Sequence, residues 1–124
     1  MELYIGGYAQ GKLDYVLQQH PKQQFVMMDG AQMTAEGVPV LFNHFHLWVK
    51  ELVWQGEDAE GITAAFVEAH PDCIIISDEV GCGIVPMEQK EREYRERLGR
   101  ILTGFARRAE RVERILCGMG QRLK

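Results

Sequence analysis

The stretch ELYIGGYAQGKLDYVLQQH, residues 2–20, carries an apolar run, a glycine-rich turn and an amphipathic segment in succession. The apolar run 2–5 ends in two glycines, a pattern typical of a strand that enters a tight turn. Residues 12–20 are expected to be helical up to Pro21, which cannot continue a helix. Their apolar side chains recur at helical spacing: Leu13, Val16 and Leu17. The stretch therefore predicts a strand, a glycine loop and a helix.

The turn GGYAQGKL, residues 6–13, matches the phosphate-binding pattern G-x-x-x-x-G-K-[ST] except at its last position. Such a loop points backbone N–H groups and a helix N-terminus at a phosphate, while its lysine reaches the β- and γ-phosphates. The candidate nucleotide-binding residues are accordingly Gly6, Gly7, Gly11, Lys12 and Leu13. Leu13 stands where a Ser or Thr hydroxyl would bind Mg²⁺, so the metal ligand is missing. A plain glycine-rich turn is the alternative interpretation, because short motifs also occur by chance.

Apolar runs and amphipathic segments continue to alternate along the chain. Further strands are expected at 24–28, 39–42, 73–77 and 112–118. The run CIIIS at 73–77 is continuous and β-branched, which suits a central parallel strand buried on both faces. Because strands that alternate with helices pair in parallel, the expected fold class is α/β. A small parallel sheet flanked by helices, of the P-loop nucleoside-triphosphate-hydrolase type, is predicted within a single domain at 1–124.

Helices are expected at 46–55, 58–70 and 88–114, and the segment QRLK closes the chain. Their inward-facing residues follow from helical periodicity. The expected core positions are Leu47, Val49, Leu52 and Val53, with surface added by Trp48 and Trp54, then Ile62, Phe66 and Val67, and finally Leu98, Ile101, Leu102, Phe105 and Ala109. Acidic and basic residues alternate in the last helix, which favours a solvated face with i,i+4 ion pairs over a nucleic-acid patch.

The composition favours a cytoplasmic protein without a nucleic-acid partner. The chain has 124 residues, a net charge of -4 and a pI near 5.6, so no basic surface for nucleic acid is indicated. The start of the chain lacks the pattern of a secretion signal, and no apolar run is long enough for a membrane span. The three cysteines are widely spaced and match neither a zinc motif nor a disulfide framework.

The four histidines are potential metal ligands. If His44 and His46 lay in a strand, their i,i+2 spacing would put both imidazoles on one face. No third ligand stands at a useful spacing, so no metal site is predicted. His20 and His70 precede prolines at helix ends, where a cation would favour the helix dipole.

Four further segments carry a resemblance to a known family. IIISDEVGCGIVP (74–86), YRERLGRIL (94–102), VERILCGMGQRLK (112–124) and VLFNHFHLWVKEL (40–52) together resemble the adenosylcobinamide kinase/adenosylcobinamide-phosphate guanylyltransferase family of cobalamin biosynthesis. The most specific part is EVGxGIVP. The resemblance implies a P-loop kinase and nucleotidyltransferase fold that uses ATP or GTP, with a nucleotide and a corrinoid as partners. Assembly into a homo-oligomer is compatible with it.

Three departures from the family pattern affect metal binding and covalent chemistry. Leu13 replaces the hydroxyl, and Asn43 replaces the carboxylate that the resemblance implies as a magnesium anchor at the end of the third strand. The family's histidine-bearing segment, in which a histidine is guanylylated, has no counterpart. Only Ala35, Glu36 and Gly37 separate the segments on either side of that point. Mg²⁺ binding is therefore expected to be weak or absent.

Lys12 and Glu79 are the candidate catalytic residues that the resemblance implies. Lys12 would hold nucleotide phosphates, and Glu79 would bind a substrate hydroxyl or act as a base, or else only cap a neighbouring N–H. Asp78 could offer another metal contact, whereas Arg97 and Arg100 either reach a phosphate or form surface ion pairs. Two hypotheses follow: a short kinase of this family without guanylyl transfer, and a degenerate, non-catalytic module that binds a nucleotide or a corrinoid.

Overall fold

The computed structural model describes residues 1–23, 25–29, 39–79 and 88–124. Within these ranges, six strands form one sheet in the order β2-β3-β4-β1-β5-β6. The strands are β1 (Glu2–Gly6), β2 (Val26–Asp29), β3 (Val40–Asn43), β4 (Ile74–Asp78), β5 (Arg111–Leu116) and β6 (Met119–Arg122). β1 to β5 pair in parallel, which confirms the predicted α/β class with a parallel sheet.

The antiparallel strand β6 is a correction, because the last strand expected from the sequence is 112–118 and none was expected after it. Leu116 of β5 pairs with Met119 of β6, and only Cys117 and Gly118 lie between them. Both turn residues have positive φ, 51° and 72°, the conformation that two-residue hairpin turns require. The turn of this hairpin therefore consists of one strained cysteine and one glycine. In the sequence, this pair is a weaker hairpin signal than Asn-Gly.

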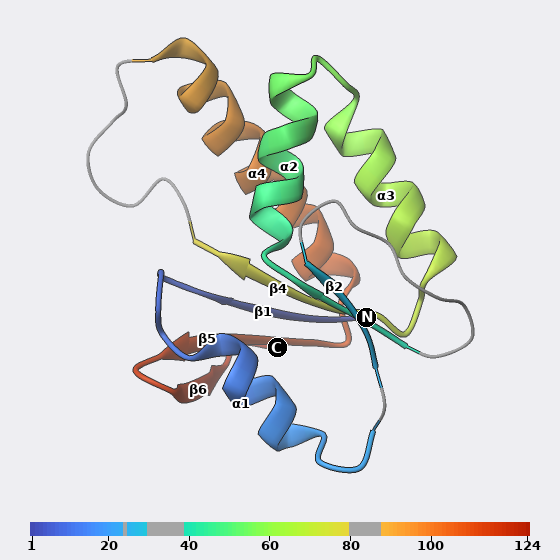
Figure 1. Ribbon diagram of the computed structural model, residues 1–124, viewed down its shortest axis with the longest axis vertical. Coiled ribbons are helices and arrows are strands. Elements are labelled where there is room, and N and C mark those ends of the chain that lie inside the picture. The colour runs from blue at the N-terminus through green and yellow to red at the C-terminus, as the bar shows by residue number, and fades with distance from the viewer. Residues whose placement is uncertain (24, 30–38, 80–87) are drawn as a thin grey trace.

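In the described part of the chain, four helices cover the two faces of the sheet unequally. They are α1 (Lys12–Gln19), α2 (Phe45–Trp54), α3 (Ala59–Ala69) and α4 (Gln89–Arg108). α1 lies on one face, whereas α2, α3 and α4 lie on the other (Figure 1). None of the helices in the described part of the chain is long and apolar enough to cross a membrane.

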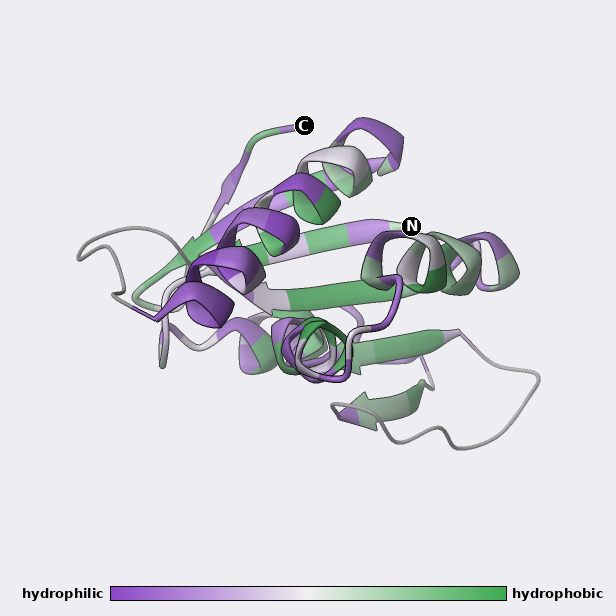
Figure 2. Cartoon of the chain, turned by 90° about the horizontal axis from the view of Figure 1, so that it is seen from above, coloured by the Kyte–Doolittle hydropathy of each residue, from purple (hydrophilic) through white to green (hydrophobic). Residues whose placement is uncertain are grey.

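The last helix is shorter than expected. It ends at Arg108 rather than at 114, because Ala109 adopts an extended conformation with ψ 143° and the chain then pairs with β1 as β5. Its inward stripe is confirmed: Leu98, Ile101, Phe105 and Ala109 are buried, and Leu102 packs against them. Much of the long helix is hydrophilic, while the strands in the middle of the molecule are hydrophobic (Figure 2).

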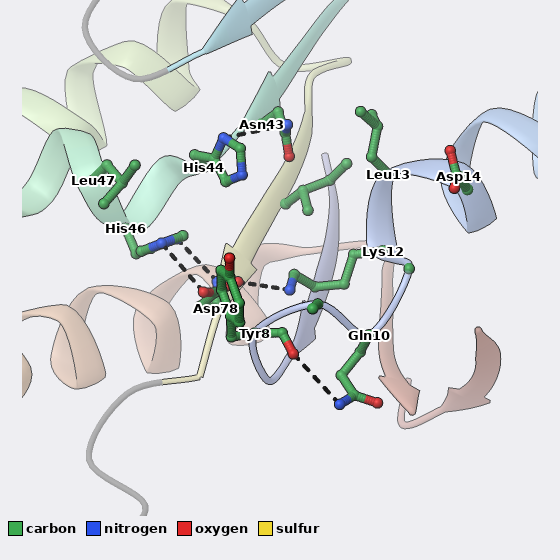
Figure 3. A pocket seen from close by; sticks show the side chains of 13 residues that line it. Tyr8, Gln10, Lys12, Leu13, Asp14, Asn43, His44, His46, Leu47 and Asp78 are labelled. Carbon is green, nitrogen blue, oxygen red and sulfur yellow. Dashed lines mark hydrogen bonds and ion pairs between the residues drawn. The ribbon is translucent and has the colours of Figure 1, made fainter. Parts of the chain in front are cut away.

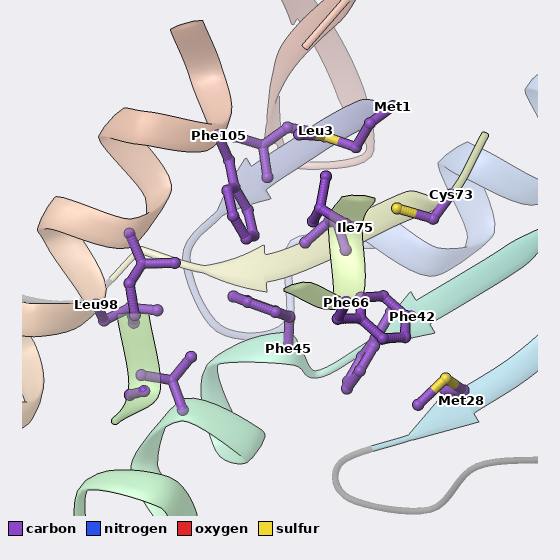
Figure 4. Packing of buried hydrophobic residues seen from close by; sticks show 14 of the residues in the cluster. Met1, Leu3, Met28, Phe42, Phe45, Phe66, Cys73, Ile75, Leu98 and Phe105 are labelled. Atoms are coloured by element: carbon purple, nitrogen blue, oxygen red, sulfur yellow. The ribbon is translucent and has the colours of Figure 1, made fainter. Parts of the chain in front are cut away.

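The core has two parts, one on each face of the sheet. The larger packs aromatic and aliphatic side chains of α2, α3 and α4 against β1, β3 and β4, around Phe42, Phe45 and Phe105 (Figure 4). The smaller lies under α1 and includes Val16. Ile74, Ile75 and Ile76 are each buried, and since successive strand residues face opposite ways, β4 is covered on both faces as predicted.

Leu47, which was expected in the core, is exposed, and so is Leu17, one of the apolar residues at helical spacing in α1. Leu17 is 41% exposed and Leu47 is 47% exposed. α1 has only eight residues and buries one narrow face, which Val16 occupies, so Leu17 faces outward. Leu47 lies in the first turn of α2, where it lines a pocket. Trp48, Trp54 and Ile62 are partly buried against the core, as expected.

Candidate functional site

The loop between β1 and α1 has a backbone that requires glycine at two positions. Gly11 has φ 79°, a left-handed conformation that side chains disfavour. A Cβ at Gly6 would lie 2.5 Å from the backbone oxygen of Ile115 in β5. The loop can therefore approach the neighbouring strand only with glycine at position 6.

The C-terminal hairpin holds this loop in place, a role that the sequence analysis missed. The N–H of Gly118 donates to the backbone oxygen of Gln10 over 2.8 Å, and the N–H of Cys117 donates to Gln10 Oε1 over 2.7 Å. A Cβ at Gly120 would lie 2.1 Å from Tyr15 Oη, so β6 also packs closely against α1. The glycine loop and the C-terminal hairpin, about a hundred residues apart in the sequence, thus hold each other in position.

A pocket of about 570 Å³ opens beside the loop. One side is formed by residues 8–14 of the loop and α1, and the other by the end of β3 and the start of α2 (Figure 3). Ile76 and Asp78 of β4 contribute between them. The pocket thus lies at the carboxyl ends of parallel strands, the usual position of ligand sites in open α/β sheets.

Lys12, the best candidate from the sequence, lies in this pocket and is already paired. Its Nζ is 2.6 Å from Asp78 Oδ1 and donates to the backbone oxygen of Gly7 over 2.7 Å. Lys12 is only 9% exposed. Two of its three N–H donors are therefore engaged, which leaves one for a ligand.

His46 completes a closed group with Asp78 and Lys12. The backbone N–H of Asp78 donates to His46 Nδ1 over 3.1 Å, and His46 Nε2 lies 3.4 Å from Asp78 Oδ2. Because Nδ1 accepts, the neutral ring carries its proton on Nε2, beside the carboxylate. Burial lowers the pKa of His46, although the charge of Asp78 opposes this shift. With a neutral imidazole, the charges of Lys12 and Asp78 cancel.

His44 has different surroundings from His46, and neither residue lies in a strand, so the shared strand face considered for a metal pair does not occur. His44 precedes α2 with φ 53° and ψ 42°, and His46 lies in the first turn of that helix. The two rings are 5.9 Å apart. His44 Nδ1 lies 2.6 Å from Asp29 Oδ1, at the end of β2. Within the described ranges, no three His, Cys, Asp or Glu side chains form a cluster suited to a metal.

The positions at which the resemblance implies magnesium ligands both line the pocket. Leu13 is partly buried against the core cluster under α1, and Asn43 is the last residue of β3. Among the described residues, two carboxylates line the pocket, Asp14 and Asp78, and Asp78 is bound by Lys12.

Glu79 is not among the described residues that line the pocket. Its backbone N–H donates to the oxygen of Gly6 over 2.8 Å, and its carboxylate pairs with Arg114 at 3.3 Å. The motif EVGxGIVP continues into residues 80–87, which lie outside the described part of the chain. So do residues 35–37, where the histidine-bearing segment was expected to be missing.

The two candidate arginines of α4 form ion pairs on the helix surface. Arg97 binds Glu60 of α3 through two N–H groups over 2.9 and 2.8 Å, and also pairs with Glu93. Arg100 pairs with Glu96 at 3.6 Å. Neither lines the pocket, so the ion-pair interpretation of these arginines is confirmed.

The chain matches a model of a known protein family. A family model described as cobinamide kinase / cobinamide phosphate guanyltransferase matches residues 8–123. The match spans nearly all of the glycine loop, the pocket and the C-terminal hairpin. A search of the curated proteins finds no match to the chain.

Proposed function

The chain belongs to the cobinamide kinase / cobinamide phosphate guanyltransferase family, and from this premise we propose that it binds the phosphates of ATP or GTP without requiring Mg²⁺. The family has a nucleotide-binding role in cobalamin biosynthesis, and the pocket beside residues 6–13 is the proposed site. One observation carries the proposal: Lys12 and residues 8–11 of the glycine loop line the same pocket as Leu13 and Asn43, whereas Gly6 and Gly7 do not line it. The pocket thus combines a phosphate-type loop with two side chains that offer Mg²⁺ no carboxylate or hydroxyl.

Binding would use the loop backbone and the remaining donor of Lys12. Backbone N–H groups at the start of a helix attract anions, and the positive end of α1 adds to this field. The site residues of the proposal are Gly6, Gly7, Gly11, Lys12 and Leu13, with Leu13 contributing backbone only. Asp78 offsets the charge of Lys12, so we propose that the affinity is modest.

The same charge balance argues against efficient phosphoryl transfer. Transfer of a γ-phosphoryl group requires stabilisation of negative charge, which Mg²⁺ and a lysine normally provide together. Here the lysine is neutralised by Asp78 at 2.6 Å. The proposal is therefore a degenerate family member that binds a nucleotide, with or without a corrinoid, and acts by association.

The domain assignment belongs to this proposal. Residues 1–124 would form one P-loop-like domain that lacks the family's histidine-bearing segment. The four histidines of the chain are His20, His44, His46 and His70, and none stands between residues 21 and 43. Guanylyl transfer through a histidine in that region would then be lost.

A retained kinase activity is the second candidate, and the match over residues 8–123 favours it. In this case the γ-phosphoryl group would pass to a hydroxyl of a corrinoid side chain. Lys12 would stabilise the transferred group, and Glu79 would accept the proton of the hydroxyl. Glu79 would first have to leave Arg114, which now pairs with its carboxylate.

Calorimetric titration with ATP and with GTP, in the presence and absence of Mg²⁺, tests the proposal. We expect binding of at least one nucleotide with little change on adding Mg²⁺. Lys12→Ala should weaken binding about tenfold or more, because it removes a charged donor, whereas Lys22→Ala, at an exposed position in the turn after α1, serves as control. A strong Mg²⁺ requirement would contradict the proposal, and no heat with either nucleotide would contradict both candidates.

The double variant Leu13→Ser with Asn43→Asp sharpens the test. It supplies the hydroxyl and the carboxylate that the family resemblance implies, so we expect it to bind nucleotide more tightly with Mg²⁺ than without. A corrinoid phosphorylation assay on the wild type and on this variant separates the two candidates. Turnover by the wild-type protein would favour the kinase.

A further inference from the structure

The Asp29–His44 pair joins the end of β2 to the start of α2, and its histidine lies at the pocket. His44 lines the pocket on the side opposite the glycine loop (Figure 3). We propose that Nε2 of His44 is a phosphate-binding donor, so that the nucleotide phosphates lie between Lys12 and an imidazolium in place of a metal ion. This inference rests on the proposed function and names a residue that the glycine-loop motif does not include.

The hydrogen-bond pattern of the ring leaves one nitrogen for a ligand. Nδ1 of His44 lies 2.6 Å from Asp29 Oδ1, and a carboxylate only accepts, so Nδ1 carries a proton. Asn43 Nδ2 also lies 3.4 Å from Nδ1. Among the described residues, Nε2 has no hydrogen-bond partner. A proton on Nε2 would make the ring cationic, with both nitrogens acting as donors.

The backbone at His44 supports a functional reason for its placement. Its φ of 53° and ψ of 42° lie in the left-handed region, which costs a histidine of order 1 kcal/mol. The side chain is 47% exposed, so burial of the ring does not repay this strain. The conformation instead joins β3 to α2 while the ring faces the pocket and pairs with β2.

The other described histidines do not combine a place at the pocket with a ring nitrogen that is free for a ligand. Both nitrogens of His46 are directed at Asp78. His20 and His70 lie at the C-terminal ends of α1 and α3 and do not line the pocket. His44 is thus the histidine with a nitrogen available to a ligand at this site.

Phosphate binding by this ring would be coupled to proton uptake. The groups that face His44 from the packed elements, or from across the pocket, are Asp29 of β2, Asn43 of β3, His46 of α2, Lys12 and Asp14 of α1, and Asp78 of β4. A bound phosphate favours the imidazolium over the neutral ring, because the cation offers it a positive charge and a second N–H donor. Affinity should therefore be higher at pH 6 than at pH 8.

The variant His44→Asn isolates the proposed donor. Asparagine tolerates the left-handed backbone better than most residues, and its Nδ2 can replace Nδ1 as donor to Asp29. Only the group at Nε2 is lost. We expect ATP without Mg²⁺ to bind the variant about tenfold more weakly at pH 6, with a smaller difference at pH 8. The ionisation of ATP itself cancels in this comparison, since both proteins bind the same ligand.

The control is His70→Asn, which removes a histidine outside the pocket and should leave ATP affinity unchanged at both pH values. A second readout needs no substitution: the ¹⁵N shift of His44 Nε2 should move toward the protonated range when ATP is added. Equal affinity of wild type and His44→Asn, or an unchanged Nε2 shift in the presence of bound ATP, overturns this inference alone. Failure of the wild type to bind ATP overturns the proposed function as well.

Discussion

Two histidines only two residues apart have opposite environments in this protein. His46 is buried, and both of its ring nitrogens are directed at Asp78, which in turn binds Lys12. His44 is half-exposed and pairs with Asp29 through one nitrogen. The difference arises because the chain turns from β3 into α2 between them. His46 belongs to a closed group with Asp78 and Lys12 that supports the loop, whereas His44 belongs to an open pair with Asp29 that a ligand can reach.

The largest effect is expected from breaking the closed group at Lys12. Lys12→Met leaves the carboxylate of Asp78 without its cation at a site where both side chains are largely buried. We expect the free energy of unfolding to fall by about 2–4 kcal/mol. This is slightly less than the loss that follows when one partner of a fully buried ion pair is removed. Urea denaturation measures the loss.

The double variant Lys12→Met with Asp78→Asn is the control for this prediction. Because it removes both charges, it should recover part of the lost stability. If the double variant is less stable than Lys12→Met by the full cost of Asp78→Asn alone, the two residues do not interact, and the closed group is not a unit.

The backbone of the loop offers a second way to disturb the same group. In Gly6→Ala the new Cβ meets the backbone oxygen of Ile115 at 2.5 Å and the Cδ of Lys12 at 3.4 Å. Since a strand backbone cannot move aside easily, we expect a loss of about 1–3 kcal/mol in the free energy of unfolding. Gly99→Ala is the matched control. Its Cβ meets no atom within 4 Å, so it should stabilise α4 by about 0.5–1 kcal/mol. Similar losses in both variants would show that the close approach at Gly6 has no special cost.

The smallest effect compares the two histidines directly. Burial lowers the pKa of His46 in the folded protein below the ordinary value of a histidine, so below about pH 6.5 the unfolded chain binds more protons at this residue. Its contribution to stability is therefore present above that pH and is lost as the pH falls toward the folded-state pKa. His46→Gln should reduce this part of the pH dependence, and His44→Asn should leave it in place while changing stability by about 0.5 kcal/mol or less. Unfolding free energies between pH 5 and 8 measure both, and identical profiles for His46→Gln and the wild type would contradict the assignment.

Much of the fold follows from local pattern. The apolar run CIIIS predicts a buried central strand, and periodicity identifies Val49, Leu98 and Phe105 as core residues. Boundaries are less well predicted, as at α4, because the sequence from 109 onward keeps its charged character when it leaves the helix. Leu47 is exposed rather than buried, because periodicity identifies a helix face without showing how much of it a neighbour covers.

The sequence by itself determined the family, the α/β class, and the place of the glycine loop and of Lys12, because spacing along the chain carries these signals. The tertiary structure alone decided that Asp78 neutralises Lys12, that the hairpin of β5 and β6 holds the loop through Gln10, and that Asp29 pairs with His44. These contacts join residues 15 to 107 positions apart. Their geometry depends on strand order and on positive-φ turns, which no local pattern of residues specifies.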